Sequence, residues 1–138
     1  MTTEAAPIVI DTNVLISAGL LPLSKTAQVL QLALANFTLV QNAATWHELE
    51  TRIAKPKFDR YFDATGRLRH LCKLAQVARQ VPERSRVQIS RDPSDDKFIA
   101  LALDAGASLV ISGDPDLKTL GRYQDIEILS PAEFFDRY

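Results

Sequence analysis

The sequence predicts an α/β protein in which helices cover both sides of a central parallel sheet, a three-layer α/β/α fold. Apolar runs suited to strands alternate along the chain with segments of helical periodicity, and this alternation is typical of parallel strands joined by helical crossovers. Residues 8–10 (Ile-Val-Ile) and 109–111 (Leu-Val-Ile) are apolar without a break. Such runs indicate strands that are buried on both faces.

Each element is predicted from its pattern and its flanking residues. Strands are expected at 8–10, 37–40, 87–89, 109–111 and 126–129, and helices over 13–18, 24–35, 43–54, 57–63, 68–80, 92–106 and from 130 onward, with a short turn or helix at 115–120. Ser24 and Asp92 stand where helix N-caps are expected, Gly106 follows a predicted helix end, and Ser130 with Glu133 forms a capping box. Gly19 is expected to end the first helix.

Length and composition favour one domain over residues 1–138. No apolar run approaches the roughly 18 residues that span a bilayer, and residues 1–6 lack the basic start of a signal peptide, so we expect a cytoplasmic protein. The single Cys72 excludes an internal disulfide and a cysteine-cluster zinc site. With only two histidines, any metal is expected to bind oxygen ligands.

The net charge of −1 hides a strong asymmetry. Residues 52–91 contain 11 basic and 3 acidic residues, a net charge of +8, while the rest of the chain contains 5 basic and 14 acidic residues, a net charge of −9. This division predicts a basic surface for a polyanion beside an acidic site for a cation. The alternative is an ordinary solvated helical face.

Asp11 is the carboxylate around which the sequence is best interpreted. It directly follows the buried strand 8–10 and precedes a helix start at Thr12 and Asn13. This order places Asp11 at the carboxyl end of a strand, where open α/β sheets bind their ligands. The alternative is that Asp11 only caps the helix.

A second group of acids opens the helix expected at 92–106. Asp96, Ile99 and Leu103 fall on one helical stripe, which predicts that Asp96 faces the core and therefore requires a cation or donors. Asp95 is expected to point about 100° away from that stripe. Asp92 is the expected N-cap.

Further acids lie after another strand and in a helix. Asp114 follows the strand 109–111, so it is expected beside Asp11, although it could instead cap the turn at Pro115. Asp116 is either an additional ligand or a surface residue. In the helix 43–54, the periodicity does not distinguish Glu48 from Glu50.

Four blocks together resemble the PIN-domain family. They are 9–15 (Val-Ile-Asp-Thr-Asn-Val-Leu), Glu48-Leu49 with 55–58 (Lys-Pro-Lys-Phe), 92–98 (Asp-Pro-Ser-Asp-Asp-Lys-Phe) and 110–114 (Val-Ile-Ser-Gly-Asp). The match covers essentially the whole chain. Within the family, the sequence is similar to the branch of the VapC-type ribonucleases and their relatives, the toxins of bacterial type II toxin–antitoxin pairs. The resemblance implies a PIN-like fold and a metal-dependent endoribonuclease activity.

Carried over residue by residue, the resemblance implies an acidic, metal-binding and catalytic site at Asp11, Glu48, Asp96 and Asp114, with Asp116 as an additional candidate. The supporting polar residues are Thr12, Asn13 and Ser112. The candidate RNA-binding residues, all from the basic stretch 52–91, are Arg52, Lys55, Lys57, Arg67, Arg69 and Lys73. Oxygen ligands of this kind suit Mg²⁺ or Mn²⁺, which activate water and stabilise the leaving oxygen in phosphodiester hydrolysis.

The resemblance also implies partners: an RNA substrate, a cognate antitoxin and a second copy of the chain. The aromatic groups Phe58-Tyr61-Phe62 and Phe134-Phe135-Tyr138 are candidate dimer contacts. A catalytically inactive PIN module that binds RNA or protein is the alternative function. A haloacid-dehalogenase-type phosphatase is disfavoured because Asn13 stands where its second aspartate is required, and a receiver domain is disfavoured because its paired acid and late lysine are not evident.

Overall fold

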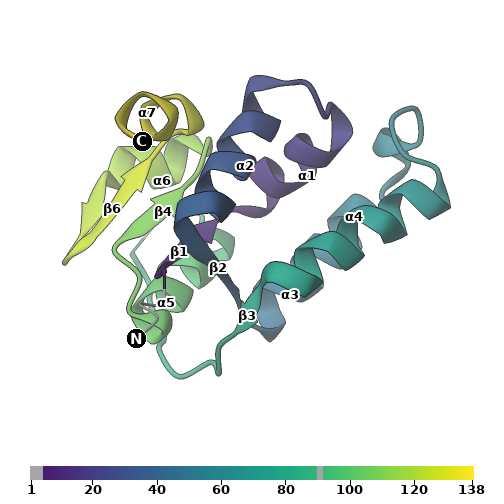
Figure 1. The fold of residues 1–138 in the computed structure, drawn as a ribbon. Helices are drawn as coiled ribbons and strands as arrows, with labels where there is room; N and C mark the ends of the chain where they lie inside the picture. The colour runs from purple at the N-terminus through teal and green to yellow at the C-terminus, as the bar shows by residue number, and fades with distance from the viewer. Residues whose placement is uncertain (1–4, 90–91) are drawn as a thin grey trace, which may run out of the picture.

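The computed structural model describes residues 5–89 and 92–138. Its six-stranded sheet has the order β3-β2-β1-β4-β6-β5. The strands are β1 (Ala6–Ile10), β2 (Phe37–Gln41), β3 (Arg79–Gln80), β4 (Leu109–Ile111), β5 (Arg122–Tyr123) and β6 (Ile126–Leu129). All neighbouring pairs are parallel except β5 with β6, which are antiparallel at one edge. The three-layer α/β/α prediction is confirmed, with an edge hairpin that was not predicted (Figure 1).

The helices cover the two faces of this sheet. They are α1 (Thr12–Leu20), α2 (Lys25–Asn36), α3 (Ala43–Ile53), α4 (Ala64–Val77), α5 (Asp96–Ala105), α6 (Pro115–Leu120) and α7 (Pro131–Arg137), with 3₁₀ turns η1 (Pro56–Phe58) and η2 (Pro93–Asp95). In Figure 1, α2 and α5 lie on opposite sides of β1, while α3 and α4 extend away from β6.

Alternation along β1 explains its unbroken apolar run. Ile8 and Ile10 belong to the core beneath α1, α2 and α7, whereas Val9 belongs to a second core with α5 and α6. All three side chains are at most 1% exposed. Successive strand residues point to opposite faces, and both faces here are covered, so every position is apolar.

The predicted strand at 87–89 is wrong. These residues have no regular secondary structure, and the edge strand is instead β3, formed by residues that were assigned to the end of a helix. Helix α4 ends at Val77 and its C-cap, Ala78, has an extended backbone; the amide of Val81 then donates to the carbonyl of Gln41 (2.8 Å). Main-chain pairing with β2 therefore follows directly after the helix.

Gly19 does not end the first helix, which continues to Leu20. A Cβ at Gly19 would lie 2.5 Å from Nε2 of His70, so the imidazole of α4 packs directly against this turn of α1. The same Nε2 lies 2.8 Å from the carbonyl oxygen of Leu15. Burial lowers the pKa of His70 from its ordinary value, which favours the neutral form of the ring between the two helices.

The remaining helix signals largely agree with the structure. Ser24 caps α2, Gly106 ends α5 in the left-handed region (φ 70°), and Ser130 with Glu133 forms the predicted capping box. The N-cap of α3, Asn42, was not predicted. The helix predicted at 57–63 is reduced to the 3₁₀ turn η1. Residues 1–4 and Arg91, which entered the predictions, lie outside the described residues. Among the helices that are described, none has the length and hydropathy to cross a membrane.

Candidate metal centre

Asp11 caps a helix and also lies near two other acids, Asp114 and Glu48. Its side chain is 4% exposed, and Oδ1 accepts the N-cap hydrogen bond from the amide of Val14 (2.9 Å). Oδ2 accepts a hydrogen bond from the hydroxyl of Ser112, a residue on the neighbouring chain segment after β4. Burial raises the pKa of Asp11, and the charges of Asp114 and Glu48 act in the same direction. The two interpretations of Asp11 are therefore compatible.

Asp114 reaches the same edge of the sheet because β1 and β4 are parallel neighbours, with Ile10 opposite Ile111. Its amide donates to the Ser112 hydroxyl oxygen (3.0 Å), while its Oδ1 accepts from the amide of Asp116 (2.8 Å) and caps α6. Ser112, which is fully buried, thus connects the two aspartate segments.

The helical prediction for this pair holds for one of the two residues. Asp96 is buried (6% exposed), as its place on the core-facing stripe predicts, but Asp95, which was expected to point about 100° away, is buried as well (7% exposed). It is Asp95 that lies beside Asp114, whereas Asp96 accepts a hydrogen bond from the amide of Ile89 (3.4 Å) and lines a neighbouring pocket. Asp95 ends the 3₁₀ turn η2, where successive residues rotate by about 120° rather than 100°, so the extrapolated α-helical phase does not hold there.

Asp95 is also the strongest sign of a cation site. Oxygens of Asp92, Asp95 and Asp116 all lie within 4.8 Å of one another. Within the described part of the chain, Oδ2 of Asp95 is the only buried side-chain oxygen or nitrogen without a hydrogen-bond partner. Burial, followed by the charges of Asp114 and Asp92, raises the pKa of Asp95 to about 7. A hard cation would supply the missing partner and relieve the repulsion.

Glu48 is held by two cations and a hydroxyl group. Its Oε1 lies 2.6 Å from Nη2 of Arg52, and its Oε2 lies 3.3 Å from Nζ of Lys97. The hydroxyl of Thr12 donates to Oε2 (2.9 Å), and Nη1 of Arg52 donates to Oδ1 of Asn13 (3.2 Å). Glu48 therefore faces the start of α1, whereas Glu50 is exposed. Thr12 and Asn13 support the Glu48 network, while Ser112 supports Asp11.

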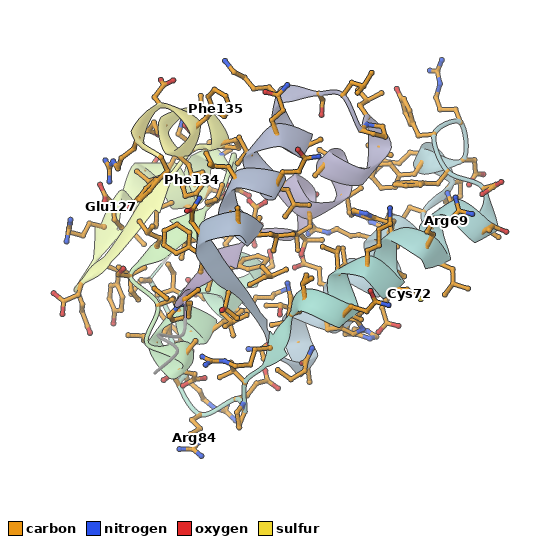
Figure 2. The ribbon with its side chains drawn as sticks, in the orientation of Figure 1. Arg69, Cys72, Arg84, Glu127, Phe134 and Phe135 are labelled. Carbon is orange, nitrogen blue, oxygen red and sulfur yellow. The ribbon has the colours of Figure 1, made fainter. Side chains whose placement is uncertain are left out.

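The predicted RNA-binding residues do not share one setting. Arg52 joins the Glu48 network. Arg67 donates to the carbonyl of Ile53 (2.8 Å) and to Oδ1 of Asp59 (2.6 Å), so it ties α4 to the preceding connection. The other four, Lys55, Lys57, Arg69 and Lys73, are exposed. Figure 2 shows Arg69 on α4 and Arg84 on the loop that follows β3, at separate places on the molecule.

Comparison with known proteins identifies the class. The sequence model described as "PIN domain" matches residues 7–116, so this chain belongs to the PIN domain family. It is 28% identical over 144 residues to the uncharacterized protein MJ1680 of Methanocaldococcus jannaschii, covering 95% of this chain and 90% of that protein. A chain in the crystal structure of VapBC2 from Rickettsia felis bound to a DNA fragment from their promoter superposes with a TM-score of 0.62 at 11% identity, covering 90% of this chain and 98% of that one. The structural likeness supports the PIN fold.

Proposed function

We propose that this chain is a metal-dependent endoribonuclease and the toxin of a toxin–antitoxin pair. The observation that carries the proposal is Oδ2 of Asp95, buried without a hydrogen-bond partner among other carboxylates at the carboxyl edge of the sheet. Membership of the PIN domain family supports a nuclease. This chain shares its fold with a chain of the VapBC2 structure, and its sequence resembles the VapC-type toxins, which pair with antitoxins. Both observations support an antitoxin as the partner protein.

The ligands that we propose are Asp95 and Asp116, whose oxygens converge with those of Asp92, together with Asp11 and Asp114 from the ends of the adjacent strands β1 and β4. Asp95 takes the place that the resemblance had assigned to Asp96. Carboxylate oxygens suit Mg²⁺ or Mn²⁺. When bound, such an ion activates water and stabilises the charge that develops on the phosphate and leaving oxygens.

The chain's own groups prepare this site. The Ser112 hydroxyl orients Asp11 and the Asp114 amide together. Glu48 holds Arg52 and Lys97 at the rim, where their charges would neutralise a backbone phosphate of the incoming RNA. We therefore propose that Glu48 positions these two cations, in addition to being one of the acids of the site, as the family resemblance implies.

The central test compares two adjacent aspartates. Wild type, Asp95→Asn and Asp96→Asn are incubated with single-stranded RNA and Mg²⁺ or Mn²⁺, with and without EDTA. We expect EDTA to abolish cleavage and Asp95→Asn to reduce it by at least about 100-fold, because loss of a ligand exceeds the roughly 10–100-fold effect of second-shell changes. Asp96→Asn is the matched control and should have a smaller effect. The reverse order would return the ligand role to Asp96.

An inactive RNA- or protein-binding PIN module is the second candidate, and the pairing of Glu48 with two cations is the observation that favours it. Such a module would show no cleavage with either metal at any pH, while binding to RNA or to a protein persisted. Chelator-sensitive cleavage by wild type that Asp95→Asn removes would exclude it.

The proposed partners are an antitoxin and a second copy of the chain. Of the six aromatic candidates for the dimer, Phe62 and Phe134 are buried, Phe58 and Phe135 are partly buried, and Tyr61 and Tyr138 are about half exposed. The core thus uses most of them, and Tyr61 and Tyr138 are what a dimer could contact. Light scattering at micromolar concentration tests this: a mass that stays near 15.3 kDa at all concentrations would contradict the dimer.

A further inference from the structure

A pocket of about 590 Å³ lies between α5 and residues 81–89, which we call the connecting segment. This volume is within the range of about 300–1,000 Å³ of ligand sites. Lys97 joins the pocket to the acidic site, because its side chain lines the pocket and its Nζ lies 3.3 Å from Oε2 of Glu48. A molecule in the pocket would therefore lie next to the proposed point of cleavage.

The connecting segment has no regular secondary structure, but it is firmly attached. At its start, the amide of Val81 donates to the carbonyl of Gln41 (2.8 Å). In its middle, the carboxylate of Asp104 on α5 accepts from the amides of Arg84 and Ser85 (2.9 Å each) and from the Ser85 hydroxyl (2.7 Å). A wall that is already ordered loses little conformational entropy when a ligand binds.

The lining combines charge with apolar surface. Arg84, Arg86 and Lys97 are its basic residues, and Val87, Pro93 and Ala100 supply apolar contacts; Glu83, Asp96 and Asp104 are its acidic residues. Of the three carboxylates in the lining, those of Asp104 and Asp96 accept hydrogen bonds from amides of the connecting segment. This mixture matches a nucleotide, which presents anionic phosphates beside a flat base.

We infer that this pocket binds one nucleotide of single-stranded RNA adjacent to the cleaved bond, with Lys97, Arg84 and Arg86 contacting its flanking phosphates and Asp104 acting as a positioning residue. The inference rests on the proposed function, since it takes RNA as the substrate. It assigns substrate contacts to the connecting segment, beyond the six basic residues predicted from the sequence.

Binding to a labelled single-stranded RNA oligonucleotide in EDTA tests the inference without cleavage. Arg84→Ala and Arg86→Ala should each weaken binding and reduce the slope of log K against log salt by about 0.7, the value for one phosphate contact on a single strand. Arg122→Ala is the matched control, because Arg122 is exposed on β5 at the opposite edge of the sheet. Equal slopes for all three variants would overturn the inference.

Asp104→Asn gives a test of opposite sign. Removal of a negative charge near a polyanion should by itself tighten RNA binding. If Asp104 positions the connecting segment, the variant should instead weaken RNA binding, and circular dichroism would verify that it is folded. Tighter binding by Asp104→Asn would overturn the positioning role.

The same variants distinguish this inference from the proposed function. RNA binding that depends on Arg84 and Arg86 without any cleavage would retain the pocket and reject the nuclease. If wild type cleaves RNA and neither arginine variant changes its KM, the proposed nuclease activity is kept and the nucleotide-binding role of the pocket is rejected. We expect KM to rise in both variants while kcat changes little, because neither residue touches the acidic cluster.

Discussion

Replacement of Asp95 by Asn should stabilise the metal-free protein, and the gain should depend on pH. The pKa of Asp95 is raised from its ordinary value of 3.8 to about 7, first by burial and then by the neighbouring carboxylates. The folded protein therefore binds this proton more tightly than the unfolded chain does. The stabilising protonated form is lost as pH rises through this window, so wild type should become less stable between about pH 4 and pH 7.

The magnitude follows from linkage. Each pH unit inside the window changes the free energy of unfolding by at most about 1.4 kcal/mol, so from pH 5 to pH 7 wild type should lose on the order of 2–3 kcal/mol through Asp95. Asparagine carries no proton to lose. Asp95→Asn should therefore be close to wild type at acidic pH and more stable than wild type by about this amount at neutral pH.

Urea denaturation in EDTA at pH 5 and pH 7 measures this difference, with Asp136→Asn on the exposed end of α7 as the control. Added Mg²⁺ should stabilise wild type at pH 7 and leave Asp95→Asn almost unchanged, because only the folded wild-type site binds the ion. A stability difference between Asp95→Asn and wild type that is the same at both pH values would refute the reasoning.

Two further predictions concern buried contacts. Gly19→Ala should destabilise the protein by about 1–3 kcal/mol, because the added methyl would overlap the imidazole of His70. In a His70→Ala background the same change should instead stabilise the protein by up to about 1 kcal/mol, as helix propensity predicts. A double-mutant cycle measured by chemical denaturation checks this, and the same sign of the Gly19→Ala effect in both backgrounds would contradict the overlap. Ser112→Ala should cost about 1–3 kcal/mol, since it leaves Oδ2 of Asp11 and the amide of Asp114 without this hydroxyl. Its control is Ser108→Ala at an exposed position, and equal unfolding midpoints for the two serine variants would contradict the connecting role of Ser112.

Much of the fold could be predicted because its signals are local. The unbroken apolar run at Ile8, Val9 and Ile10 indicated a strand covered on both faces, and the capping residues Ser24 and Ser130 marked helix starts that the structure contains. The edge strand β3 could not be predicted in this way. It has two exposed residues, and its pairing depends on where α4 ends relative to β2.

The candidate site was predictable where strand order alone decides it. Asp11 and Asp114 follow adjacent parallel strands, so their proximity needs no side-chain detail. Our proposal of Asp95 in place of Asp96 depends on whether the Asp-Pro opening forms an α-helical or a 3₁₀ turn, which periodicity does not report. The Asp-Pro-Ser-Asp spacing was the available signal, because it places a tight turn before the helix. The pairing of Glu48 with Lys97 joins two helices that lie far apart along the chain, so the sequence pattern could not predict it.

The hydrogen bond between Asp11 and Ser112 has a consequence for biosynthesis, since it connects residues 101 positions apart. During translation Asp11 is made early, and until β4 is complete its strand has only β2 to pair with. The last aspartates of the acidic cluster, Asp114 and Asp116, follow later still. For the ribonuclease that we propose, this order means that the site is not complete until Asp116 has been synthesised, so a partly synthesised chain is poorly placed to cut the message from which it is being translated.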